Sequence, residues 1–133
     1  MKNIILLDTG VLSLYLINDE IVIKELSTLG KKNYVFLSSE VNFIELYNHL
    51  CREKGKINAQ IIMENLRRRK LMEFIPVSNT TSALAGELKC IYHSLSIVDS
   101  IICAEALKRK AFIYTTETNF KDIKDIKVKK FNF

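Results

Sequence analysis

The stretch Ile4-Ile5-Leu6-Leu7-Asp8-Thr9-Gly10 contains the features that decide the fold. Four apolar residues in succession are typical of a short strand that is buried on both faces, as in a parallel sheet covered by helices. Asp8 follows at once, and the apolar pattern Val11-Leu12-Leu14-Tyr15-Leu16 then starts a helix. We therefore expect Asp8 at the carboxyl end of a strand, where ligands bind in an open parallel α/β sheet.

Further apolar runs predict strands, and helical patterns lie between them. The expected strands are residues 4–7, 34–37, 74–77 and 112–115, and residues 126–129 alternate as a half-exposed edge strand would. The expected helices include residues 40–52, 59–70, 80–92 and 97–110, with Gly55 ending one helix and turning the chain into a helical hairpin. This alternation predicts an α/β fold, a three-layer α/β/α sandwich with a central, mostly parallel sheet.

The bulk properties agree with a single domain over residues 1–133. The chain is 48% hydrophobic and 26% charged, which is ordinary globular composition. The cysteines Cys51, Cys90 and Cys103 are odd in number and widely spaced, which argues against a disulfide framework or a zinc site. No apolar stretch has the length of a signal peptide or a membrane span. We therefore expect a cytoplasmic protein with no membrane association.

The basic residues indicate little by themselves. A net charge of +5 suits a polyanionic partner but is modest. The run Arg67-Arg68-Arg69-Lys70 ends a predicted helix, where cations interact favourably with the helix C-terminus and are usually solvated. Contact with nucleic-acid phosphates is the alternative interpretation. His49 and His93 are far apart and lack the spacing of metal ligands.

Four acidic residues lie at or near points where an apolar segment meets a turn or a helix start: Asp8, Glu45, Asp99 and Glu117. If they converge at the carboxyl edge of the sheet, the natural occupant is a hard divalent cation, which takes oxygen ligands. Two carboxylates about 4 Å apart repel by about 4 kcal/mol at an effective dielectric constant of about 20, so a cation or a bound proton must offset the repulsion. The pattern predicts a metal-dependent enzyme that cuts phosphodiester bonds.

Each acid also has a simpler explanation. Asp8 is a good N-cap for the helix that follows, and for Asp8 alone this interpretation has about equal weight. Asp99 forms a capping-box pattern with Ser96. Asp99 also heads the apolar stripe of its helix, where an unpaired carboxylate is costly, and this favours a functional role.

Glu45 and Glu117 are weaker candidates when each is taken singly. Glu45 shares a polar stripe with Asn42, Asn48 and His49, and exposure of this stripe to water explains it without an active site. Glu117 lies in a polar turn, where an acid needs no special function. Periodicity therefore favours a structural interpretation of Glu45, and the polar turn favours one of Glu117.

Four stretches, taken in order, resemble the PIN domain family and especially its VapC-type toxin ribonucleases. They are Leu6-Leu7-Asp8-Thr9, residues 38–46 ending in Ile44-Glu45-Leu46, residues 95–102, and Thr115-Thr116-Glu117-Thr118-Asn119-Phe120. Each is weak alone, but their order and separations fit the family over nearly the whole chain. The resemblance implies a parallel sheet whose acids hold Mg²⁺ or Mn²⁺, cleavage of RNA, frequent homodimers and inhibition by a small antitoxin protein.

The resemblance also assigns roles to residues. Asp8, Glu45 and Asp99 stand at the three principal acidic positions of the family, and Glu117 stands where a fourth acid, most often Asp, occurs. Thr115 matches the hydroxyl residue that supports this fourth acid. We expect Asp8 and Asp99 to bind the metal directly, Glu45 to bind it or orient its water, and Glu117 to hold a second ion or a water.

Departures from the family pattern leave a second function open beside the predicted toxin endoribonuclease. Gly10 replaces the Asn or Ser that is common after Asp-Thr, Glu117 is one methylene longer than Asp, and Asn119 is neutral where a further Asp often occurs. These features favour a non-catalytic PIN-like module that binds RNA or a protein. A phosphoacceptor signalling domain fits poorly, because such domains need paired acids after the first strand and here only Asp8 follows it.

Overall fold

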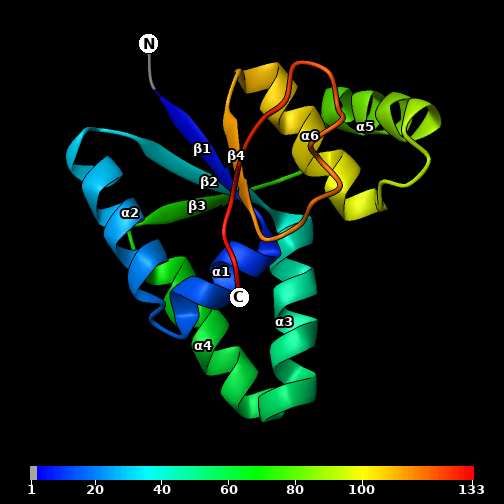
Figure 1. Cartoon of the computed structure of the whole chain (residues 1–133). Coiled ribbons are helices and arrows are strands. Elements are labelled where there is room, and N and C mark those ends of the chain that lie inside the picture. The colour runs from blue at the N-terminus through cyan, green and yellow to red at the C-terminus, as the bar shows by residue number, and fades with distance from the viewer. Residues whose placement is uncertain (1–2) are drawn as a thin grey trace.

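The computed structural model describes residues 3–133, and its strands form one sheet in the order β3-β2-β1-β4-β5. The strands are β1 (Ile4–Leu7), β2 (Val35–Ser39), β3 (Met72–Ile75), β4 (Phe112–Thr115) and β5 (Lys127–Lys130). All four neighbouring pairs are parallel. The helices are α1 (Thr9–Leu16), α2 (Glu20–Lys31), α3 (Glu40–Lys54), α4 (Lys56–Arg68), α5 (Asn79–Ile91) and α6 (Ile97–Arg109) (Figure 1).

Helices cover both faces of the sheet, with α5 and α6 on one side and α1 to α4 on the other (Figure 1). Successive side chains of β1 alternate between these layers because a strand has a period of two. Ile5 and Leu7 belong to the core cluster formed with α1 to α4, whereas Leu6 belongs to the cluster formed with α5 and α6. The predicted three-layer α/β/α sandwich is confirmed.

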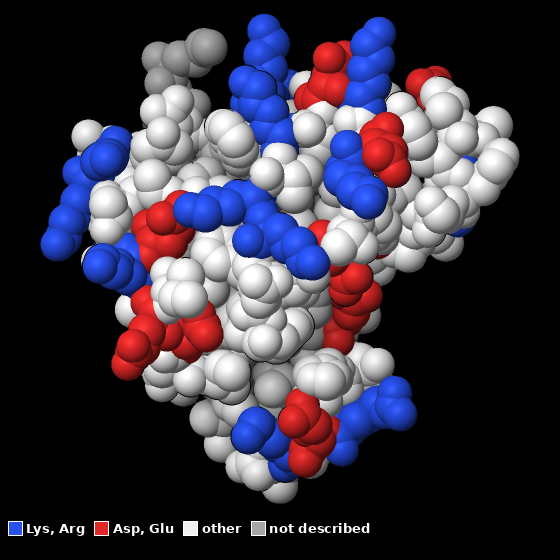
Figure 2. Space-filling view, in the orientation of Figure 1, with Lys and Arg blue, Asp and Glu red and all other residues white. Residues whose placement is uncertain are grey.

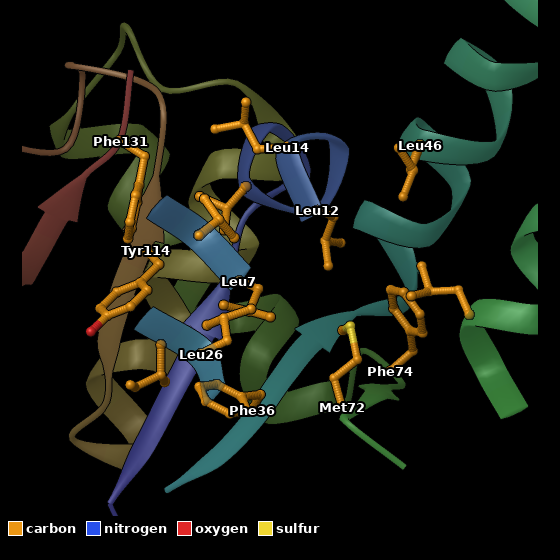
Figure 3. Packing of buried hydrophobic residues seen from close by; sticks show 14 of the residues in the cluster. Leu7, Leu12, Leu14, Leu26, Phe36, Leu46, Met72, Phe74, Tyr114 and Phe131 are labelled. Atoms are coloured by element: carbon orange, nitrogen blue, oxygen red, sulfur yellow. The ribbon is translucent and has the colours of Figure 1, made fainter. Parts of the chain in front are cut away.

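The larger core cluster fixes β1 in the centre of the sheet. Figure 3 shows Leu7 of β1 and Tyr114 of β4 packed with Leu12, Leu26 and Leu46 from three helices. Burial of each large apolar side chain contributes about 2 kcal/mol. The carboxyl end of β1, and with it Asp8, is therefore held in a rigid surrounding.

Two elements differ from the expectations. Helix α2 was not predicted. Asp19 caps this helix by accepting a hydrogen bond from the Val22 amide at 3.1 Å, and Val22 and Leu26 of the helix are buried. Strand β3 covers Met72–Ile75 instead of residues 74–77. The charged, exposed Glu73 interrupts the apolar run, so the start of this strand was not recognised in the sequence. The strand ends before Pro76, which has no N–H to donate to a neighbouring strand.

The other expected elements are present, with ends that match the expectation or differ from it by a few residues. Gly55, at a φ of 86°, separates α3 from α4 and makes the predicted helical hairpin. Strand β5 lies at the edge of the sheet and is mostly exposed, as the alternation predicted. Among residues 3–133, no helix combines the length and apolar character needed to cross a membrane.

Candidate active site

Asp8 lies at the carboxyl end of β1, with only 3% of its surface exposed. Its Oδ1 accepts hydrogen bonds from the Thr9 amide at 2.9 Å and from Asn42 Nδ2 at 3.1 Å. Its Oδ2 accepts from Thr115 Oγ1, at the end of β4, at 2.8 Å. Asp8 is thus the N-cap of α1, as one interpretation predicted, and it also receives hydrogen bonds from three separate segments, while its functional role stays a prediction.

Burial sets the acidity of Asp8. The pKa of Asp8 is raised from 3.8 to about 6, mainly because burial removes water from around the carboxyl, and the charges of Asp99 and Glu45 contribute to this rise. The hydrogen bonds from Thr115 and Thr9 act in the opposite direction. Near neutral pH the metal-free Asp8 carboxyl is therefore close to its titration range and is receptive to a cation.

Asp99 lies in the first turn of α6 and is half-buried. Its amide donates to Ser96 Oγ at 3.0 Å, so the predicted cap is present, while its Oδ2 accepts from Asn119 Nδ2 at 2.6 Å. Burial raises the pKa of Asp99, and the charges of Glu117 and Glu45 add to this effect, whereas the hydrogen bonds from Asn119 and Ser96 lower it.

Electrostatic effects on these two pKa values link all four predicted acids. The charges of Asp99 and Glu45 raise the pKa of Asp8, and the charges of Glu117 and Glu45 raise the pKa of Asp99. Glu45 and Glu117 are exposed, and Figure 2 shows acidic side chains gathered where α3 and the start of α6 lie in Figure 1. Within residues 3–133, however, no three His, Cys, Asp or Glu side chains are close enough to hold a metal ion on their own. The roles of the four acids stay a prediction.

Asn42, which contacts Asp8 directly, is a candidate site residue that the sequence analysis missed. The polar stripe of α3 was interpreted as solvent-facing, and Asn48 and His49 are indeed exposed. Asn42 is instead fully buried, and its Nδ2 donates to Asp8 Oδ1 and to Thr9 Oγ1 at 3.0 Å. The interpretation that the whole polar stripe faces water is therefore wrong for Asn42, which contacts the carboxylate of Asp8.

Asn119 repeats this arrangement at Asp99, because each amide group donates to one of the two acids. The Oδ1 atoms of Asn42 and Asn119 are both buried without a hydrogen-bond partner in the described part of the chain. Buried polar atoms of this kind are rare and call for an explanation such as an ion or a water. Their occurrence beside the two acids marks this place as a candidate site.

A steric contact explains why residue 10 is a glycine. A Cβ at this position would overlap the hydroxyl of Thr116 and lie 3.0 Å from the Thr116 Cβ. Thr116 directly follows Thr115, whose Oγ1 donates to Asp8 and accepts from the Glu117 amide at 3.0 Å. The absence of a side chain at residue 10 therefore lets the loop after β4 approach the start of α1.

Two of the other polar residues noted in the sequence, Arg67 and His49, have structural contacts. Arg67 forms two hydrogen bonds with Glu40, at 2.6 and 2.8 Å, and its guanidinium lies 3.7 Å from the ring centre of Phe43. His49 pairs with Glu53 at 2.6 Å and both are exposed. None of these contacts involves the four acids.

Comparison with known proteins identifies the fold. The chain resembles VapBC2 from Rickettsia felis, solved bound to a promoter DNA fragment, with a TM-score of 0.83, 21% identity and coverage of 97% of this chain and 99% of that chain. It also resembles DNA-bound VapBC from Salmonella typhimurium, with a TM-score of 0.79, 16% identity and 98% coverage of both chains.

A third neighbour is the Mycobacterium tuberculosis toxin VapC20, described as cleaving the sarcin-ricin loop. Its TM-score is 0.65 at 17% identity, with coverage of 88% of this chain and 91% of that chain. A search of curated proteins gave no match. The family model described as PIN domain matches residues 5–126. The chain therefore belongs to the PIN domain family.

Proposed function

We propose that this chain is a metal-dependent endoribonuclease that acts on RNA in the cytoplasm as the toxin of a toxin-antitoxin pair. One observation carries the proposal: the buried carboxyl of Asp8 is held by three donors at the end of the central strand, where the charge of Asp99 also acts on it. Membership of the PIN domain family, a family of nucleases, supports it. A neighbour with the same fold is described as a toxin that cleaves the sarcin-ricin loop.

The residues present fit a hard divalent ion such as Mg²⁺ or Mn²⁺. These ions prefer oxygen ligands and retain several waters. Asp8 and Asp99 supply carboxylate oxygens, and the Oδ1 atoms of Asn42 and Asn119 are buried acceptors without partners. We infer that Asp8 and Asp99 would hold the ion and that the two amide oxygens would accept from its waters.

The chain's own side chains would prepare the reaction. Thr115, Asn42 and the Thr9 amide fix the orientation of Asp8, and Asn119 does the same for one oxygen of Asp99. A bound divalent ion lowers the pKa of water and neutralises charge on the phosphate.

The exposed carboxylates have a separate part in this scheme. Glu45 and Glu117 are open to solvent and close enough to Asp99 to raise its pKa. We infer that Glu45 binds the ion or orients its water and that Glu117 holds a second ion or a water.

The proposal includes partners. Several solved neighbours are toxin-antitoxin assemblies, among them FitAB and VapBC complexes with DNA. We infer that a small antitoxin protein binds and inhibits this chain and that the chain forms a homodimer. Co-expression with the protein encoded beside it, followed by light scattering of each species, tests both inferences.

The direct test is incubation of the purified protein with mixed RNA and Mn²⁺. Asp99→Asn in the same buffer is the control for a contaminating nuclease, because this variant keeps the shape of the side chain and loses its charge. We expect cleavage by the natural chain only. Intact RNA across a range of pH values and of Mg²⁺ and Mn²⁺ concentrations would contradict the enzyme proposal.

The second candidate function is that of a non-catalytic module that binds RNA or a protein. It is favoured by the neutral Asn119, by the longer Glu117, and by the absence, within residues 3–133, of a cage of three acidic side chains. Unchanged RNA that is nevertheless bound by the protein would select this candidate.

A further inference from the structure

A basic cleft lies at the amino end of the sheet, opposite to Asp8. Its volume is about 400 Å³, and it is lined by the start of β1, by four cations and by two aromatic rings: Lys108, Arg109, Lys110, Lys127, Tyr34 and Phe112. No Asp or Glu among residues 3–133 lines this cleft. Lys and Arg side chains project from the upper edge of Figure 2, where α6 ends and β4 begins in Figure 1.

The four cations differ in whether they form ion pairs or hydrogen bonds within the protein. Arg109 Nε donates to the buried Glu105 at 2.7 Å, and Lys108 Nζ donates to Thr81 Oγ1 at 2.7 Å and lies 3.9 Å from the same carboxylate. In contrast, Lys110 and Lys127 are exposed and form no ion pair within the described residues. Two ammonium groups are therefore free to bind an anion at the mouth of the cleft.

The backbone of Lys110 is unusual. The residue follows α6 with φ 53° and ψ 45°, the left-handed region where helices most often place glycine. A residue with a Cβ loses about 1 kcal/mol there. Lys108 and Arg109 already supply favourable charge at the helix end. This conformation lets the amides of Lys110 and Ala111 donate to the Ala106 carbonyl and so ends the helix, and the ammonium group of Lys110 is left exposed at the cleft.

Phe112 supplies an exposed ring beside these charges. It is the first residue of β4, 42% of its surface is exposed, and Lys127 Nζ lies 5.6 Å from its ring centre. Cations interleaved with an open aromatic face are what single-stranded nucleic acids require, because phosphates pair with the cations and bases stack on the ring.

We propose that this cleft binds a nucleotide of single-stranded RNA, with its phosphate at Lys110 and Lys127 and its base on Phe112. The inference takes RNA as the ligand from the proposed function, but it needs no cleavage. Strand β1 spans about 13 Å, so the cleft and the site at Asp8 are separate. The cleft would hold a part of the RNA away from the bond that is cut.

The test measures binding of a labelled single-stranded RNA by fluorescence anisotropy, with EDTA present so that metal-dependent cleavage is suppressed. The double variant Lys110→Glu/Lys127→Glu is compared with Lys24→Glu/Lys56→Glu, which changes the net charge equally at exposed lysines outside the cleft. We expect the Kd of the cleft variant to exceed that of the control about tenfold. The slope of log K against log salt should also weaken by about 1.4, because two phosphate contacts are lost.

Phe112→Ala should raise the Kd about tenfold with little change in the salt slope. Phe112→Leu, which keeps apolar bulk and removes the ring, serves if the alanine variant unfolds. Equal affinity of the cleft variant and the charge-matched control would overturn the proposal, and so would tighter binding of DNA of the same sequence. Competition by a free mononucleotide, lost in the cleft variant, would support it.

The outcome is independent of catalysis. RNA binding that depends on Lys110 and Lys127 in a protein that cuts nothing in Mn²⁺ would support the cleft and refute the enzyme. Cleavage by a protein whose RNA affinity does not depend on these residues would do the reverse.

Discussion

The substitution Asp8→Asn probes the buried carboxyl most sharply. Asn keeps the shape of the side chain and one acceptor oxygen for the Thr9 amide and for Asn42 Nδ2, and Thr115 Oγ1 can turn to accept from the new amide. The variant removes the titrating charge from the position where burial raises the pKa. Its stability should therefore depend on pH differently from that of the natural chain.

The size of the effect follows from the pKa. In the unfolded chain Asp8 loses its proton near pH 3.8, whereas in the metal-free folded protein it keeps the proton up to about pH 6. Ionisation of the folded state is therefore penalised, and no penalty exists below pH 3.8. As the pH rises from 3.8 through 6, the natural chain loses about 3 kcal/mol of unfolding free energy, at about 1.4 kcal/mol per pH unit.

The assay is urea unfolding in EDTA between pH 4 and pH 8. We expect Asp8→Asn to be more stable than the natural chain by about 3 kcal/mol at pH 7.5 and to lose this advantage near pH 4. Glu73→Gln, which removes an exposed carboxyl of β3 outside the candidate site, is the matched control. Parallel pH profiles for Asp8→Asn and the natural chain, or a variant less stable at pH 7.5, would refute the reasoning.

Three further variants are expected to lose unfolding free energy in urea. Asn42→Ala should lose about 2 kcal/mol, because buried Asp8 loses a donor, and an unchanged midpoint would contradict this contact. Gly10→Ala should lose about 1–3 kcal/mol through overpacking against Thr116, and Thr116→Gly in the same chain should recover most of it; a loss that persists counts against the steric explanation. Glu105→Gln should lose about 1–2 kcal/mol, because Arg109 loses its carboxylate; full stability would show that this pair contributes little.

Much of the fold could be predicted because its strands are short apolar runs. Residues 4–7 and 112–115 were predicted with the observed bounds, since short continuous apolar runs are typical of strands in a parallel sheet covered by helices. Helix α2 was missed although Asp19 and the spacing of Val22 and Leu26 carry its signal. Strand β3 was displaced because an exposed Glu73 interrupts the apolar run from which strands were inferred.

The candidate site could be predicted only in part. Asp8 was found because strand ends in parallel sheets are places where ligands bind. Its partners lie 34 and 107 residues away in the chain, and no local pattern shows that Asn42 points inward while Asn48, on the same stripe, is exposed. The steric match of Gly10 with Thr116 likewise arises only when β1 and β4 are paired.

The central claim is that side chains from distant segments hold one divalent ion at the end of β1. A crystal soaked in Mn²⁺ and measured for anomalous scattering tests it most directly. We predict a manganese peak about 2 Å from carboxylate oxygens of both Asp8 and Asp99. Manganese bound only at other carboxylates, or a peak that persists unchanged in Asp8→Asn, would contradict the account.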